Sequence, residues 1–273
     1  MLIIFDAVVD TLYNTRDLPF SRSELIRNEF NSVVAHIFRK MVVDFRGILE
    51  ATTNDPHCNI ESNIHPATVL LVRFLEFWYR NGEMVRSVLG TWDCPIDLTM
   101  IDYWVSKLSR DAEIMFPAQV KGKRHVFVMN NIFYVYEMKH HPGGFLSRAQ
   151  LQSLRLLIDQ YIKSYLEEYW IPLVMYLNGD SLNIPCRSLW DKFIEEFFSN
   201  CGQMTWKVRT ELKEMLREEI VKLILPRYAN FLKVLREENP SSCWPCWSKR
   251  MWRARSKYTA AWLEGVVREF FER

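Results

Sequence analysis

The sequence predicts an all-α protein, built as an elongated rod of stacked antiparallel helical bundles. Three observations support this fold class. Apolar residues recur every three or four positions, no segment shows convincing strand alternation, and only 9 of the 273 residues are glycine. Several predicted helices are about 30 residues long, or roughly 45 Å. Helices of that length with short connections pack as antiparallel neighbours.

The first two predicted helices have recognisable starts. One runs from Ser21 to Thr53, with apolar residues on a single face, and Ser21 and Glu24 form the pattern of a capping box. The next begins at His65-Pro66 and stops near Gly82. Proline is favoured there because the first helical position needs no N–H donor.

The rest of the chain repeats the helical spacing. Asp97 is a candidate N-cap, Ser147 with Gln150 is a second capping-box pattern, and most glycines fall where helices end. Val and Phe content would also allow a strand over His125–Val135, but the apolar spacing there fits a helix equally well. Further helices are therefore predicted over residues 97–115, 124–139, 147–165, 188–200, 205–236 and 256–272.

The sequence shows no signal for export or for membrane insertion. Its N-terminus, Met1–Asp6, lacks a basic lead, and an acid interrupts the short apolar run. No apolar stretch reaches the roughly 18 residues of a membrane span. The 6 cysteines are scattered, unlike a disulfide framework. We expect a reduced, intracellular protein that is soluble or peripheral at a membrane.

Motifs of all-α enzymes are missing from the sequence. A di-iron bundle needs two Glu-x-x-His motifs, and only Glu137-x-x-His140 occurs. Cys243-Trp244-Pro245-Cys246 has metal-like spacing, but a closed zinc site needs four ligands and no second pair lies nearby. An ordinary loop is favoured there over a zinc or redox site. We expect no catalytic residue, no metal and no cofactor.

The strongest local feature is a basic run near the C-terminus that contains no acid. Because the net charge of the chain is only +2, the remainder is net negative. Such a run suits an anionic membrane, a protein partner or nucleic acid, or it forms a solvated face beside tryptophans in the core. Its five cations are Lys249, Arg250, Arg253, Arg255 and Lys257, interleaved with tryptophans 244, 247 and 252.

Several sequence blocks, in order, are similar to one protein family. They are Phe5-Asp6-Ala7, Ile26–Glu29, Ile64–Thr68, Val126–Ile132, Tyr165-Leu166 with Trp170, Trp206–Val208, Leu216–Glu219, and Pro226 with Tyr228 and Phe231. Over nearly its whole length the chain resembles the seventy-kilodalton subunit of the exocyst, especially the plant members. The resemblance implies a helical rod in which residues 1–60 end one bundle, 61–155 form a middle bundle and 156–273 form a C-terminal bundle with a basic, membrane-facing end.

The resemblance also implies a function and a site. Family members tether secretory vesicles to the plasma membrane and bind phosphatidylinositol bisphosphate through C-terminal basic residues. Lys257 matches a lysine of the family's motif, and Arg187 falls at a second basic position. The implied lipid-binding set is Lys257, Arg255, Arg253, Arg250, Lys249 and Arg187.

The implied partners are phosphoinositides, other exocyst subunits and other proteins, with no nucleic acid. The implied location is the cytoplasm, peripheral at the plasma membrane. The chain resembles an N-terminally truncated, divergent member without the coiled coil that joins the other subunits. The alternative function is therefore a protein-interaction scaffold, with a role in plant immunity as one example, that no longer joins the exocyst.

Overall fold

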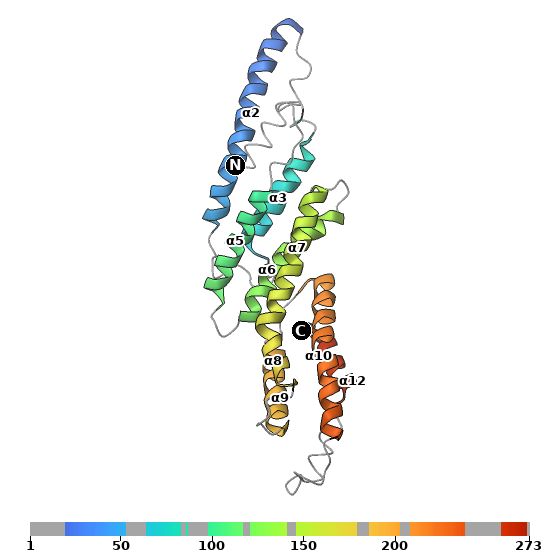
Figure 1. Ribbon diagram of the computed structural model, residues 1–273. Helices are drawn as coiled ribbons and strands as arrows, with labels where there is room; N and C mark the ends of the chain where they lie inside the picture. The colour runs from blue at the N-terminus through green and yellow to red at the C-terminus, as the bar shows by residue number, and fades with distance from the viewer. Residues whose placement is uncertain are drawn as a thin grey trace. The chain divides into compact units, whose positions relative to one another are not determined.

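The computed structural model describes a chain whose regular elements are helices (Figure 1). This confirms the all-α prediction for the described residues. Within them, no helix is both long enough and apolar enough to cross a bilayer. The described residues are 20–52, 64–82, 86, 98–116, 121–140, 146–178, 186–202, 208–237 and 258–271.

The chain divides into two compact units. One consists of Met1–Ala51 with Phe77–Pro95, and the other of Thr52–Glu76 with Ile96–Arg273. The main described element of the first unit is helix α2 (Phe20–Ala51). It already includes Ser21, which the sequence placed at the N-cap. Its buried face carries Val34, Phe45 and Leu49, all 3% exposed or less, at the spacing the sequence predicted.

Helix α3 (Pro66–Arg80) begins at the predicted proline. The backbone carbonyl of His65 accepts the first helical N–H groups, from Thr68 at 2.9 Å and Val69 at 3.1 Å. α5 (Leu98–Met115) follows, directly after the predicted cap position 97, which lies outside the described residues.

Helix α6 (Lys121–Tyr136) settles the one segment that the sequence left between strand and helix. It continues into a short 3-10 turn, η4 (Glu137–His140). Residues 126–133 of α6 are all buried, because α5 and α7 pack against it. Because this stretch is enclosed by its neighbours, its Val and Phe residues are not confined to one face, and that content is what also allowed a strand.

Helix α7 (Arg148–Tyr165) begins with the predicted capping box. The Ser147 hydroxyl accepts the Gln150 N–H at 3.2 Å, and the Gln150 side chain accepts the Ser147 N–H at 2.7 Å. The helix then widens into a π-helical turn, η5 (Leu166–Trp170), and resumes as α8 (Ile171–Met175). Pro172 explains the change, because proline lacks an N–H and its ring would clash with a carbonyl one turn earlier.

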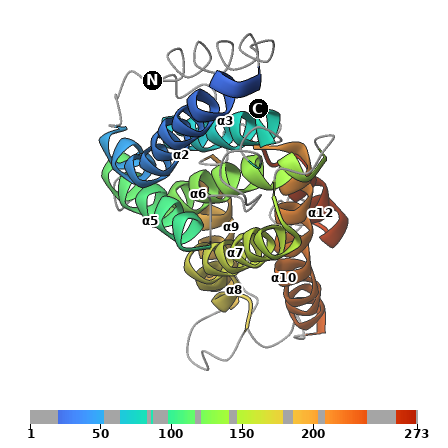
Figure 2. The ribbon, with the colours of Figure 1, turned by 90° about the horizontal axis from the view of Figure 1, so that it is seen from above.

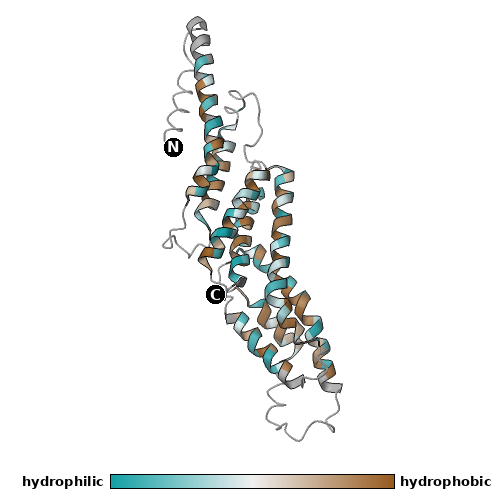
Figure 3. Cartoon of the chain, turned by 60° about the vertical axis from the view of Figure 1, so that its left-hand side comes forward, coloured by the Kyte–Doolittle hydropathy of each residue, from teal (hydrophilic) through white to brown (hydrophobic). Residues whose placement is uncertain are grey.

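The C-terminal part of the second unit contains α9 (Cys186–Gly202), α10 (Thr210–Glu237) and α12 (Ala260–Arg268). Seen from above, α10 lies beside α12 (Figure 2). Most helices show a hydrophobic and a hydrophilic face (Figure 3). Aromatic rings fill the core here: Trp170 stacks on Phe270 with ring centroids 5.7 Å apart, and Phe193 lies 5.5 Å from Tyr228.

Candidate functional site

Helix α12 is fixed at its C-terminal end by a buried arginine of α10. The guanidinium of Arg217 donates to the backbone carbonyl of Phe270, through Nε at 2.9 Å and also through Nη2. Its Nη1 donates to Glu214 at 2.7 Å. Arg217 is 6% exposed, so these bonds lie in a low-dielectric setting where a charged donor is strong. They stabilise the end of the chain against α10.

The start of α12 is fixed one residue after the basic run. Burial raises the pKa of Tyr228, so its phenol stays protonated and donates to the Tyr258 carbonyl at 3.0 Å. The next residue, Thr259, caps the helix by accepting the Trp262 N–H at 3.0 Å. Tyr228 pairs with Tyr258 and Arg217 with Phe270, so α10 and α12 run antiparallel. The basic run lies in the connection between them.

An aromatic cluster joins α9 to the same place. The ring of Trp190 stacks on Phe231, with centroids 6.0 Å apart, and lies edge-on to Tyr258 at 6.3 Å. Trp190 is one helical turn after Arg187, and Tyr258 directly follows Lys257. The described residues therefore bring the first turns of α9 into contact with Tyr258, the residue just before the cap of α12.

The six predicted lipid-binding side chains themselves are not described. Residues 249–257, with Lys249, Arg250, Arg253, Arg255 and Lys257, lie outside the described part of the chain, as does the Cys243–Cys246 motif. Arg187 has a described backbone in α9, but its side chain is not described. The structure thus places the residues next to the predicted site, and the site itself stays a prediction.

The Glu137-x-x-His140 motif is part of an ion pair within the described residues. Glu137 of the Glu-x-x-His pattern lies in η4 and forms an ion pair with Arg209 at 3.1 Å.

Burial raises the pKa of the Cys201 thiol to about 12, so this cysteine stays protonated and is a poor nucleophile. Among the described residues no group of three His, Cys, Asp or Glu side chains could hold a metal ion.

A buried polar network was missed by the sequence analysis. Asn131, fully buried in α6, accepts the backbone N–H of His65 at 2.7 Å and the Thr68 hydroxyl at 2.8 Å through Oδ1. Its amide nitrogen donates to the Phe127 carbonyl at 2.9 Å. The neighbouring Asn130 accepts the Arg209 N–H, just before α10, at 3.1 Å. Two adjacent asparagines in an otherwise apolar run are the signal that would have found it.

Three charged or titratable side chains extend the network. Asp111 Oδ2 lies 3.2 Å from His65 Nε2 and 3.0 Å from Lys107 Nζ. The other imidazole nitrogen of His65, Nδ1, accepts the Ala67 N–H at 3.1 Å. This acceptor role requires Nδ1 to be unprotonated, so the arrangement selects the neutral imidazole with its proton on Nε2, the nitrogen that lies near Asp111. Burial, the largest cause, lowers the His65 pKa in the same direction.

The network joins two of the family-like sequence blocks. His65 and Thr68 belong to the Ile64–Thr68 block, and Asn131 to Val126–Ile132, more than 60 residues later. Arg217 and Tyr228, which anchor α12, belong to two further blocks. These five residues of the family-like blocks therefore fix the start of α3 and both ends of α12.

Comparison with known proteins identifies the family. The family model for the C-terminal part of the Exo70 subunit of the exocyst complex matches residues 1–264. Exocyst complex component EXO70A3 of Arabidopsis thaliana is 20% identical over an alignment of 221 residues, which covers 74% of this chain and 38% of the relative. A structure of Exo70 from S. cerevisiae matches with a TM-score of 0.58 and 19% identity, over 97% of this chain and 57% of that chain. The chain thus spans less than two thirds of the length of either relative. It belongs to the Exo70 family of exocyst complex subunits.

Proposed function

We propose that this chain is a non-enzymatic tethering or adaptor protein of exocytosis that acts as an exocyst subunit in the cytoplasm, peripheral at the plasma membrane. Its family membership supports this role. The matched relatives are an exocyst component from a plant and Exo70 from yeast. Because the chain spans 38% of the one and 57% of the other, the role needs a direct test.

We further propose that the chain binds phosphoinositide-containing membrane through Arg187 and the basic run at residues 249–257. One observation carries this proposal: Trp190, a turn after Arg187, contacts Tyr258, which directly follows Lys257. Arg187 and the basic run, far apart in the sequence, thus have neighbouring residues in contact. Each cation near an anionic leaflet contributes about 1 kcal/mol, so a run of five is a sizeable attraction.

Sedimentation with vesicles containing phosphatidylinositol bisphosphate tests the site. The charge-reversed variant R253E/R255E/K257E is expected to lose most of the binding. R73E/R148E/K163E is the matched control, because it makes the same change in net charge at three exposed cations elsewhere. Binding that survives the first variant unchanged, or falls equally in the control, would overturn the proposed site.

The proposed assembly role has its own test. Purification of the tagged chain from its own cells should recover other exocyst subunits. Recovery of other proteins without any exocyst subunit would support the scaffold alternative instead. This experiment does not depend on lipid binding, so the two parts of the proposal stand or fall separately.

A further inference from the structure

The start of helix α3 is capped by a histidine, whereas α7 is capped by a serine. The Nδ1 atom of His65 accepts the Ala67 N–H at 3.1 Å, and the Ser147 hydroxyl accepts the Gln150 N–H at 3.2 Å. A hydroxyl oxygen remains an acceptor across the whole range near neutral pH. A protonated imidazole, in contrast, is a donor at both nitrogens. Of these two helix starts, that of α3 is therefore the one whose cap depends on pH.

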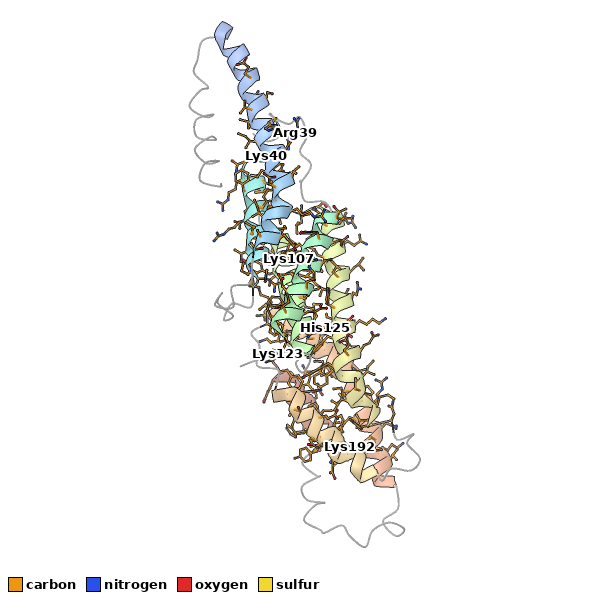
Figure 4. All side chains as sticks on the ribbon, turned by 90° about the vertical axis from the view of Figure 1, so that its left-hand side faces the viewer. Arg39, Lys40, Lys107, Lys123, His125 and Lys192 are labelled. Carbon is orange, nitrogen blue, oxygen red and sulfur yellow. The ribbon has the colours of Figure 1, made fainter. Side chains whose placement is uncertain are left out.

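A lysine and an aspartate of α5 set the charge around the His65 ring. Nε2 of the ring lies 3.2 Å from Asp111 Oδ2, and the same oxygen lies 3.0 Å from Lys107 Nζ. All three residues are buried, between 2 and 9% exposed, and Figure 4 labels Lys107 on α5. One carboxylate thus faces two bases. While the imidazole is neutral the charges of the cluster balance, whereas a proton on His65 adds a net positive charge in a buried place, which is costly.

Asp111 and Lys107 act on His65 in opposite directions. Burial is the largest influence and lowers the His65 pKa, Asp111 raises it, and Lys107 lowers it, so the pKa lies below the ordinary 6.5. Among the described residues these two are the charged groups that face the imidazole. Helix α6 contributes Phe127, whose ring lies edge-on at 6.1 Å, and Asn131. The cap is therefore complete at neutral pH and is lost as the pH falls through the folded-state pKa.

Asn131 limits what the proton changes. Its Oδ1 accepts the His65 N–H at 2.7 Å and the Thr68 hydroxyl at 2.8 Å, and an amide side chain does not titrate in this range. The backbone carbonyl of His65 also accepts the N–H groups of Thr68 and Val69, without help from the imidazole. These bonds hold residue 65 in place in both protonation states. The Ala67 N–H is the group that loses its acceptor.

We propose that the buried cluster of His65, Lys107 and Asp111 is a pH-sensitive switch at the start of α3, in which acidification charges the imidazole and frees the Ala67 N–H. Lys107 sets the switch, because it occupies the carboxylate that would otherwise stabilise the imidazolium. The switch goes beyond the proposed function and depends neither on lipid binding nor on exocyst assembly.

Solution NMR of the full chain tests the switch, by following the His65 ring and the exchange of two backbone amides from about pH 7.5 to about pH 5. The Ala67 amide reports the histidine cap, and the Gln150 amide reports the matched serine cap. The ratio of their exchange rates removes the intrinsic dependence of exchange on pH. This ratio should rise as the pH falls below 6.5, by up to about tenfold per pH unit, and its midpoint should coincide with the titration of the His65 ring.

Two variants of α5 should move this midpoint in opposite directions. Lys107→Met leaves Asp111 to the imidazolium and should raise the midpoint by roughly 1 pH unit, whereas Asp111→Asn leaves Lys107 facing the ring and should lower it. Arg110→Met removes an exposed cation from the same helix, so it is the control and should leave the midpoint unchanged. His65→Asn supplies a cap that does not titrate, so its exchange ratio should stay constant.

Each outcome decides the matter. A wild-type exchange ratio that stays constant as the pH falls overturns the switch. A midpoint that both α5 variants move in the same direction, or that neither moves, overturns the role of Lys107 and Asp111. Circular dichroism checks that the variants fold, and if one α5 variant does not, the other still gives the direction of its shift. No vesicle or partner subunit enters the experiment, so its failure is distinct from a failure of the proposed function.

Discussion

At the scale of single residues, the buried polar network shows how one side chain starts a helix. The Nδ1 of His65 accepts the Ala67 N–H, which is the role that an N-cap side chain normally plays. The Nε2 atom of the same ring lies 3.2 Å from Asp111 Oδ2. The bond from Ala67 needs an unprotonated Nδ1, which the imidazolium lacks, so the first turn of α3 depends on the protonation state of one residue.

His65 leads to a prediction about pH. Burial lowers its folded-state pKa below the ordinary 6.5, so below that pH the unfolded chain binds a proton that the folded chain resists. Its contribution to stability is therefore complete above about pH 6.5 and falls as the pH drops below it, by at most about 1.4 kcal/mol per pH unit. Thermal melts from neutral to mildly acidic pH measure this loss. His65→Asn keeps a capping side chain that does not titrate, so its melting temperature should depend less on pH; an identical dependence would contradict the assignment.

Gly122 leads to a second prediction. It lies inside α6, where a Cβ would come within 3.1 Å of the Tyr169 ring. That ring is stacked on Tyr165 at 5.7 Å and meets Trp170 edge-on at 6.0 Å, so it has little room to move. Gly122→Ala should therefore destabilise by about 1 kcal/mol in spite of the better helix propensity of alanine.

Gly265 provides the matched control, since a Cβ added there would have no atom within 4 Å and the residue is exposed in α12. Gly265→Ala should stabilise the chain by about 0.5–1 kcal/mol. Urea unfolding of both variants gives the comparison. Equal effects at the two glycines would show that the Tyr169 ring imposes no constraint.

At the scale of elements, local signals were predictable and contacts between distant segments were not. The capping box of Ser147 and the proline start of α3 were found because their partners lie within three residues. The π-helical turn before Pro172 was not predicted. The sequence shows the proline, but a helix can accommodate a proline either by a kink or by a widened turn. Asn131 was matched only as part of a block, because its partners are 63 and 66 residues away.

The candidate site shows the same division. The basic run is visible in the sequence as a local excess of charge. The blocks with Tyr228 and Arg217 were also recognised from the sequence. That these two residues anchor α12 could be seen only in the folded structure. Trp190 had no local signal that would link it to Tyr258. Only the packing of α9 against the antiparallel α10–α12 pair brings these rings together.

Arg217 leads to a prediction for α12. Arg217→Met keeps much of the volume but leaves the Phe270 carbonyl without its charged donor, which should cost about 3 kcal/mol. Arg268→Met is the control, because Arg268 is 66% exposed and solvent screens its pair with Glu264. Urea unfolding gives the stabilities, and amide exchange should show lost protection in residues 260–268. Similar costs for both arginines would contradict the anchoring role of Arg217.

At the scale of the whole molecule, a net charge of +2 conceals separated charges. The basic run concentrates five cations in nine residues, and the rest of the chain is net negative. Attraction to an anionic surface then depends on where the charges lie, since screening limits each cation to about 10 Å at moderate salt. Tryptophans 244, 247 and 252 add an apolar part to the same run, which salt does not screen.

These two parts of the attraction are separable by salt. Raising the salt from about 0.1 M to about 1 M shortens the screening length from roughly 10 to 3 Å, so binding to vesicles with phosphatidylinositol bisphosphate should fall steeply and then level off. The residual binding is assigned to insertion of the tryptophans, and the variant W247A/W252A should lose it while keeping most of the low-salt binding. Trp104, fully buried in α5, is unsuitable as a control because its loss would unfold the core, so exposed Phe198→Ala serves instead. A wild-type curve that falls to zero at high salt would show that charge alone holds the chain at the membrane.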